Sequence, residues 1–285
     1  MSLVLVTMIW GLTFVTVKDA ISRMPVMDFL ALRFTLATLI MVLVRPKSIL
    51  HYSKQDFLRG IGLGAVLGAG YVTQTLGLTS TSAAVSGFIT GMFVVFTPLI
   101  AGLILRRKIG ITAWLAVAVA TAGLAIISLK GLSIGPGELL TLACAVLYAF
   151  HIIGLGEWST GKDSYAFAVI QLAAVAVMCG AGAIPGGFTM PPDYAAWGAI
   201  LLTAVLATAF AFVIQTWAQS LLSPTRTAII LTMEPVFAGL FAVLIGGEVL
   251  GIRTLVGGAL VLSAMYLTEL GPRHAREGAI PHLEA

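Results

Sequence analysis

Two ionisable side chains inside long apolar stretches could do chemistry, Glu234 and His151. Glu234 immediately precedes Pro235, whose missing amide leaves a backbone carbonyl one turn earlier without its helical partner. A carboxyl group beside such a weakened turn could bind a substrate ammonium group or titrate, or it is a neutral, hydrogen-bonded group that shapes a kink. His151 is the only histidine in an apolar stretch. Because a free histidine titrates near pH ~6.5, it would suit proton coupling, and a packed, hydrogen-bonded histidine is the alternative.

A third charged side chain, Arg33, lies near the start of another apolar stretch. At the usual helical rise it is about 9 Å from that end. A long arginine side chain can extend to the surface, or it can pair with Asp28 or Asp19. We therefore expect a structural role for Arg33.

Uncharged polar and aromatic residues recur in the apolar stretches at helical spacing. Thr90 and Thr97 share one helical face, and Thr227 and Glu234 share a face of a later stretch. Polar groups in hydrocarbon are costly unless they face a partner or a cavity, so these faces predict a central cavity. Threonines bonded to their own backbone and aromatic anchors at an interface are the alternative. The predicted substrate-binding residues are Trp10, Thr13, Tyr71, Gln74, Thr90, Tyr148, His151, Gln215, Trp217 and Glu234.

The chain that carries these residues is too apolar for a water-soluble domain. Of its 285 residues, 59 % are hydrophobic and 10 % are charged, and the mean hydropathy is +1.04. A helix that spans the hydrocarbon layer needs ~20 apolar residues. The prediction is an all-α integral membrane protein with ten transmembrane helices, at approximately 3–20, 27–44, 59–78, 83–105, 111–129, 136–156, 164–184, 194–220, 224–246 and 251–270.

Orientation follows from the lysine and arginine residues, which collect on the cytoplasmic side. If the spans alternate, eleven of the sixteen lie on the side shared by both termini and four lie on the other. We therefore predict cytoplasmic termini, a cytoplasmic tail at 271–285 and, for the whole protein, the bacterial inner membrane. The first stretch is predicted to be a retained span rather than a signal peptide. The net charge of +4 is spread over loops, which indicates topology signals and not a nucleic-acid partner.

An internal repeat divides the predicted helices into two halves. Gln74-Thr75 recurs as Gln215-Thr216 at an offset of 141 residues, and the segment 98–103 recurs as 235–240 at an offset of 137. Because each half would contain five spans, the second half must enter the membrane from the opposite side. The predicted organisation is two inverted five-helix repeats, 3–130 and 135–270, around a shared central cavity. Such repeats are typical of secondary transporters.

Several short motifs carry a resemblance to a known family. They are Trp10-Gly11, Gly87-Phe88-Ile89-Thr90-Gly91, Ser223-Pro224-Thr225-Arg226, Glu234-Pro235-Val236-Phe237-Ala238 and Gly247-Glu248. With these motifs the chain resembles the EamA-type transporters of the drug/metabolite transporter superfamily, from about residue 3 to 270. The resemblance implies ten helices in two inverted repeats and export of amino acids and related metabolites. One departure is visible, because Arg106-Arg107-Lys108 stands where the second half has Gly247-Glu248, so Glu248 is expected to cap or position one helix end.

The leading functional prediction is a secondary exporter of small metabolites, with amino acids, including aromatic ones, as the best candidates. A nucleotide-sugar or sugar-phosphate carrier is the alternative, although phosphate would need cations in the cavity. A membrane-embedded enzyme is a third reading, but the sequence contains no His-Glu-x-x-His, no Gly-x-Ser-x-Gly and no glycine-rich phosphate loop. We therefore expect no enzymatic activity, no metal and no cofactor. A small-molecule substrate and the lipid bilayer are the expected partners, and the sequence leaves the oligomeric state open.

Overall fold

The computed structural model describes residues 2–47, 52–104, 110–130, 133–159, 161–221 and 230–270. Within these ranges the regular secondary structure is helical apart from two short antiparallel strands, β1 (Leu129–Lys130) and β2 (Ser133–Ile134). The predicted helical class is confirmed, with this small hairpin as an addition. Three predicted features lie outside the described residues: the tail 271–285, the basic segment 106–108 and the segment 223–227, which includes Thr227.

The helices follow the predicted apolar stretches. Before the hairpin they are α1 (Ser2–Ile21), α2 (Val26–Val44), α3 (Lys54–Leu78), α4 (Ala83–Gly91), α5 (Phe93–Ile104) and α6 (Ile111–Ser128). After it they are α7 (Pro136–Trp158), α8 (Ser164–Ala183), the 3₁₀ turn η2 (Ile184–Gly186), α9 (Tyr194–Leu202), the π-helical segment η3 (Thr203–Phe210), α10 (Ala211–Leu221), α12 (Met233–Leu244) and α13 (Ile252–Leu270). The segments α9, η3 and α10 are consecutive, so they form one long helical span.

Short polar side chains determine where several helices begin. The side-chain oxygens of Ser53, Ser82, Asp163 and Asp193 accept hydrogen bonds from first-turn amides of α3, α4, α8 and α9 at 2.8 to 3.3 Å. These amides have no partner inside their own helix, and a cap of this kind contributes about 1 kcal/mol. The caps therefore place the helix starts at the residues that separate the apolar stretches.

Seven helical segments are long and apolar enough to cross a membrane, and Ile111–Ile127, Met233–Leu244 and Ile252–Leu267 are shorter apolar helices. Large apolar side chains lie on the outside, and Leu43 and Val177 are 78 % and 73 % exposed. Extensive apolar surface is costly in water and favourable in lipid, so the chain is a multi-pass membrane protein. The exact number of ten spans stays a prediction.

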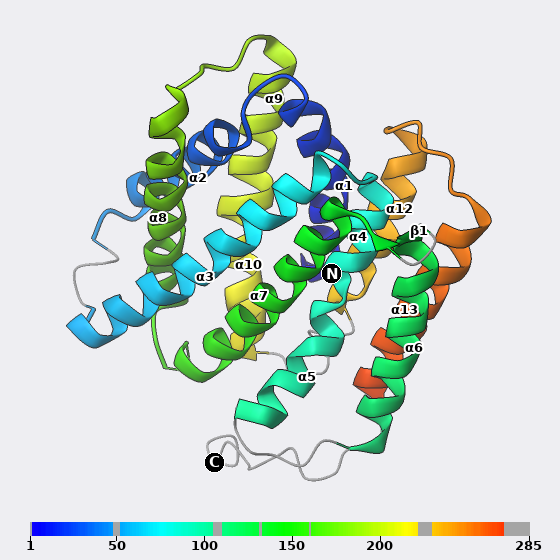
Figure 1. The fold of residues 1–285 in the computed structure, drawn as a ribbon. Coiled ribbons are helices and arrows are strands. Elements are labelled where there is room, and N and C mark those ends of the chain that lie inside the picture. Colours follow the sequence, from blue (N-terminus) through cyan, green and yellow to red (C-terminus); the bar gives the residue numbers. More distant parts are fainter. Residues whose placement is uncertain are drawn as a thin grey trace.

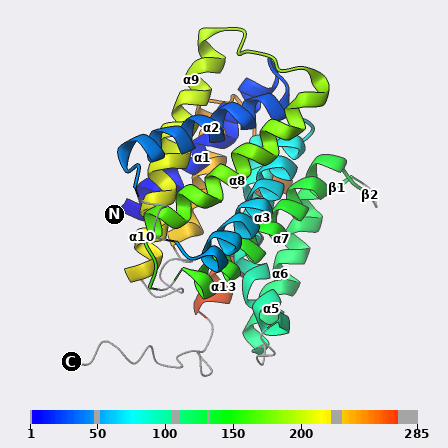
Figure 2. The ribbon, with the colours of Figure 1, turned by 90° about the vertical axis from the view of Figure 1, so that its left-hand side faces the viewer.

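The helices pair across the two halves of the sequence. α3 lies beside α7, α2 beside α8 and α6 beside α13, as the two views in Figures 1 and 2 show. Between α2 and α8 the interior is filled by Phe29, Phe34 and Leu172, whose side chains are completely buried. The first and second halves therefore share one interior.

Gly123 of α6 and Gly257 of α13 allow these two helices to approach backbone to backbone. A Cβ atom added to either glycine would lie 2.7 Å from the carbonyl oxygen of the other. No side chain fits at this distance, because the partner is backbone and cannot turn aside. Small residues at such crossings are the usual means of close helix packing in membranes.

Candidate functional site

A small cavity lies between helices of both halves, with a volume of about 60 Å³. This is room for roughly two water molecules and far less than the ~300–1,000 Å³ of a typical ligand site. The structure therefore shows a cavity with room for a few atoms only. It is lined by Trp10, Thr13, Phe14, Arg33, Leu67, Tyr71, Gln74, Phe93, Tyr148, His151, Ile152, Phe212, Gln215, Leu231 and Glu234.

Of the predicted substrate-binding residues, all but Thr90 and Trp217 line this cavity. Thr90 lies one layer behind, where its hydroxyl accepts a hydrogen bond from Gln74 Nε2 at 3.2 Å. Trp217 is 51 % exposed on the outside of α10. It follows Gln215 by two residues, which is a rotation of about 200° around a helix, so the two side chains point to opposite sides. The substrate contacts of the lining residues stay a prediction.

A hydrogen-bonded chain forms one polar wall of the cavity. The Tyr148 hydroxyl of α7 donates to Gln74 Oε1 of α3 at 3.4 Å, and Gln74 in turn donates to Thr90 of α4. The Tyr71 ring packs edge-on against the Tyr148 ring, with 5.6 Å between the centroids. Because each group restrains the next, three helices hold the amide and the two phenol rings in fixed orientations.

The π-helical segment η3 lies behind the cavity, where it contacts the lining residue Trp10. The Trp10 indole donates from Nε1 to the Ala207 carbonyl of η3 at 2.8 Å, and its ring lies 6.1 Å from the Phe212 ring, centroid to centroid. π-Helical turns are rare and are found mostly at functional sites. This wider turn was not predicted from the sequence.

The helical span of α4 and α5 is interrupted beside the cavity, at Met92. There the Met92 amide donates to the Ile89 carbonyl at 3.0 Å, a tighter turn than in an α-helix. The second half contains a similar break, because α12 begins at Met233 and is preceded by Thr232, whose backbone angles (φ −63°, ψ −13°) resemble those of Met92 (φ −57°, ψ −17°). Interrupted helices at a midplane site are a feature of many secondary transporters.

The break at Thr232 places Glu234 in the first turn of α12. The positive end of a helix dipole favours a negative charge at this position. Glu234 lines the cavity with an exposed fraction of only 8 %, and it forms no ion pair or side-chain hydrogen bond with any described residue. Its carboxyl group is therefore directed to whatever occupies the cavity.

His151 lines the cavity and also connects two helices. Its Nε2 atom donates to Gln171 Oε1 of α8 at 2.7 Å, and Gln171 Nε2 donates to the Phe167 carbonyl at 3.1 Å. Both side chains are buried. These contacts of Nε2 match the alternative in which His151 is a packed, hydrogen-bonded side chain.

Arg33 departs from its expected role. The expected partners are engaged elsewhere, since Asp19 pairs with Arg23 at 2.7 Å and Asp28 accepts a hydrogen bond from the Thr189 amide at 2.9 Å. Arg33 instead lines the cavity and is 3 % exposed. The expectation of an outward-reaching or acid-paired arginine was therefore wrong, and the sequence did not place Arg33 at the cavity.

Glu248 has the capping role that the family resemblance implied. Gly247 has a φ of +63°, which a glycine adopts at low cost, and the chain turns there at the end of α12. The Glu248 carboxylate then accepts hydrogen bonds from the amides of Ala83 and Ala84 at 2.7 and 3.2 Å. A residue of the second half thus caps the first turn of α4 in the first half.

Replacement of Glu248 by alanine is expected to lower the free energy of unfolding by about 1–3 kcal/mol, because two charge-assisted hydrogen bonds to a helix start are lost. Thermal unfolding of the purified protein in detergent measures the effect. Glu248→Gln keeps one acceptor oxygen and should give an intermediate value. Equal melting temperatures for the alanine variant and the native chain would contradict the capping role.

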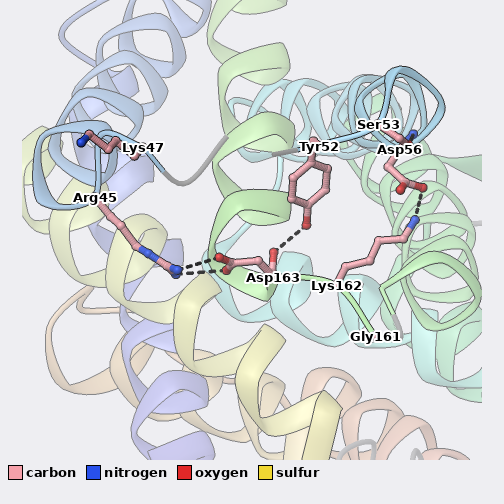
Figure 3. Close-up of a pocket in the computed structure, with 8 residues that line it drawn as sticks. All are labelled: Arg45, Lys47, Tyr52, Ser53, Asp56, Gly161, Lys162 and Asp163. Atoms are coloured by element: carbon pink, nitrogen blue, oxygen red, sulfur yellow. Dashed lines mark hydrogen bonds and ion pairs between the residues drawn. The ribbon is translucent and has the colours of Figure 1, made fainter. Parts of the chain in front are cut away.

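A second, larger cavity of about 470 Å³ lies at the loop ends between α2 and α3 and between α7 and α8 (Figure 3). Two ion pairs cross it: Arg45 with Asp163 at 2.8 Å, and Lys162 with Asp56. The Tyr52 hydroxyl donates to the Asp163 carbonyl at 2.7 Å, and burial raises the pKa of Tyr52 to about 12. The remaining lining residues are Lys47, Ser53 and Gly161.

These ion pairs join the first half to the second: Arg45 follows α2 and Asp56 lies in the first turn of α3, whereas their partners precede α8. Each acidic group already has a cationic partner in this cavity. Its charges therefore hold the loop ends together, and the central cavity remains the stronger candidate for a substrate site.

In the described ranges, no group of three or more histidine, cysteine, aspartate or glutamate side chains is close enough to hold a metal ion. Cys144 and Cys179 are free and buried, as expected of small apolar groups.

Comparisons with known proteins agree with the helical membrane fold. The family model described as "EamA-like transporter family" matches residues 1–129 and 135–270. An uncharacterized transporter from Archaeoglobus fulgidus is 31 % identical over 272 residues, which cover 95 % of this chain and 85 % of that protein. A crystal structure of a protein with 19 % identity has a TM-score of 0.66 and covers 94 % of this chain and 96 % of its own, which shows a shared fold. The chain therefore belongs to the EamA-like transporter family of the drug/metabolite transporter superfamily.

Proposed function

We propose that this protein is a secondary exporter of amino acids, including aromatic ones, and that it works by alternating access through the central cavity. The observation that carries the proposal is the lining of that cavity. Helices of both halves contribute amides from Gln74 and Gln215, a buried carboxyl group from Glu234, and aromatic rings. Such a mixed lining suits a small solute with polar ends and an apolar body.

The packing supports a topology of two inverted five-helix repeats, 3–130 and 135–270. A twofold axis would give each helix contact a counterpart in which the halves are exchanged. The contact of α1 with α12 has a counterpart in α7 with α4 and α5, that of α3 with α7 in α10 with α1, and that of α3 with α8 in η3 with α2. The family model also matches the two halves separately.

The small cavity and the interrupted helices support alternating access. A space of about 60 Å³ is too small for an aromatic amino acid, so helices must separate on one side to admit the substrate. The breaks at Met92 and Thr232 lie beside the cavity in corresponding spans of the two halves. Breaks of this kind let one part of a span move while the other stays packed.

The proposed substrate class draws on the aromatic walls and on a family resemblance. Tyr71, Tyr148, Trp10 and Phe212 surround the polar groups. The short motifs suggest a similarity to the amino-acid exporter YddG, and the proposal extends that activity to this chain. We place the protein in the bacterial inner membrane with both termini in the cytoplasm, because the basic residues at the loop cavity in Figure 3 belong to the predicted cytoplasmic side.

The other functional readings have weaker support. A sugar-phosphate or nucleotide-sugar carrier would need several cations around the phosphate, and Arg33 is the one cation among the described lining residues. Glu234 in the same cavity would repel a phosphate. For a membrane-embedded enzyme, the described ranges offer no cluster of metal-binding side chains.

The proposal is tested with the full chain reconstituted in liposomes. Vesicles loaded with unlabelled phenylalanine should accumulate labelled phenylalanine from outside, and vesicles loaded with buffer should not. Liposomes without protein and liposomes with a heat-denatured sample are the controls. If none of the twenty amino acids supports exchange above these controls, the proposed substrate class is wrong.

A further inference from the structure

Arg33 combines burial with a position at the centre of the transporter. It lies in α2, about 10 Å from the helix start at the usual rise. Its Nε atom donates to the Thr208 hydroxyl of η3 at 2.9 Å. The guanidinium carbon lies 4.8 Å from the centroid of the Tyr71 ring and 5.1 Å from that of Phe34. The group is thus held from three sides and faces the cavity.

The described part of the chain provides no counter-charge in contact with Arg33. Five acidic side chains form ion pairs with other cations: Asp19, Asp56, Asp163, Asp193 and Glu248. Glu234 lines the same cavity, yet no ion pair joins it to Arg33 in this structure. A buried charge without a paired anion is costly, so it is usually retained where a ligand supplies the opposite charge.

The guanidinium group is suited to one ligand chemistry in particular. It presents five N–H donors in a planar fork, of which Nε–H is used by Thr208, and this fork matches the two oxygens of a carboxylate. The rings of Phe34 and Tyr71 lie at 64° to each other and flank the guanidinium group from two directions, so they restrict where it can move. Glu234 offers the complementary charge for an ammonium group elsewhere in the same cavity.

We propose that Arg33 binds the carboxylate of the transported solute and thereby selects amino acids over amines that lack a carboxylate. This inference rests on the proposed function, because it assigns one end of the proposed substrate to one side chain. Thr208 acts as a positioning residue: its hydroxyl holds Nε across the contact between α2 and η3 and thereby fixes the guanidinium group beside the cavity. Arg33 is then a specificity-determining residue.

The first test needs no substitution. In the liposome exchange assay, external phenylalanine and phenethylamine, which lacks the carboxylate, compete with labelled phenylalanine for the native protein. We expect phenethylamine to compete at least tenfold less well, because a charge-assisted hydrogen bond is worth roughly a factor of ten or more in affinity. Equal competition would overturn the inference and leave the proposed function intact. No phenylalanine exchange at all would contradict the proposed function instead.

The second test compares side-chain variants. Arg33→Gln should reduce phenylalanine exchange at least tenfold and remove the discrimination against phenethylamine, and Arg33→Lys should retain part of both. Thr208→Val should weaken phenylalanine binding with a smaller loss of maximal rate. Arg253→Gln, at an exposed arginine of α13, is the matched control and should transport as the native protein does.

Variants are compared only when they elute as monodisperse protein and keep the native melting temperature. If Arg33→Gln fails this criterion, the mutation-free competition and Arg33→Lys still decide the question. An Arg33→Gln variant that folds and still prefers phenylalanine tenfold over phenethylamine would overturn the inference. Strong competition by phosphate esters in the native protein, at the level of phenylalanine, would also overturn it and would indicate a phosphate-binding site.

Discussion

Replacement of Glu234 by glutamine is expected to reduce amino-acid exchange by at least tenfold while the protein still folds. Glu234 is 8 % exposed, lines the central cavity and forms no ion pair with another described residue, so its charge serves no visible packing function. Glutamine has the same size and keeps an acceptor oxygen, but it cannot supply the negative charge that attracts an ammonium group. Loss of a charged hydrogen-bond partner typically costs about 1.5–3 kcal/mol, which is tenfold or more in binding.

Liposome exchange of labelled phenylalanine measures this effect, with melting temperature as the check on folding. Glu157→Gln is the matched control, because Glu157 is an exposed carboxylate near the end of α7 and lies outside the cavity. Native rates in the Glu234→Gln variant would remove Glu234 from the binding site. Equal losses of exchange in both variants would indicate a general effect of removing a carboxylate, not a role of Glu234 in binding.

Replacement of Gly123 by alanine is expected to destabilise the protein strongly. The added methyl group would lie 2.7 Å from the Gly257 carbonyl oxygen, so α6 and α13 would have to move apart along their contact. Overpacking of a tight interface costs about 1–3 kcal/mol. The melting temperature in detergent should fall, and the yield of monodisperse protein should fall with it.

Gly180 of α8 provides the matched control for this prediction. A Cβ atom at Gly180 meets nothing within 4 Å, so Gly180→Ala should be neutral or slightly stabilising, since alanine is favoured over glycine in a helix by roughly 0.5–1 kcal/mol. If Gly123→Ala melts at the same temperature as Gly180→Ala, the close approach of α6 and α13 does not limit stability.

The helical faces that gather polar residues could be predicted from the sequence. Tyr71 with Gln74 and Tyr148 with His151 lie at spacings that put each pair on one face, and the structure brings both pairs to one cavity. The same rule of helical spacing also separates Trp217 from the cavity. Its separation from Gln215 already places it on the opposite face, and a stricter use of helical phase would have excluded it.

The position of Arg33 could not be predicted in this way. The helix that carries it is apolar on all sides, so helical phase does not reveal which side faces the interior. Its distance from the helix end suggested a side chain that reaches the surface, whereas packing against Tyr71 and Thr208 turns it inward. Only the packing of α2 against α3 and η3 determines whether the Arg33 side chain reaches the surface or points to the interior.

The irregular turns also depend on tertiary structure. Met92 and Thr232 are not prolines, and no local signal of the sequence separates α4 from α5. The break at Met92 falls six residues before Pro98, beyond the turn that this proline weakens, whereas the break at Thr232 falls within the turn that Pro235 weakens. Such turns are stable only because neighbouring helices supply packing around them.

The crossed ion pairs of the loop cavity bear on the energetics of a transport cycle. Asp163 and Asp56 hold cations at one end of the molecule, and Glu248 and Asp193 hold cations at the other. If the halves rock as proposed, opening one end breaks its pairs and leaves those at the other intact. The populations of the inward-open and outward-open states then depend on the difference in stabilising free energy between the ion pairs at the two ends. They do not depend on the sum. Because exposed pairs contribute only about 0–1 kcal/mol each and are screened by salt, ionic strength would tune this balance without trapping either state.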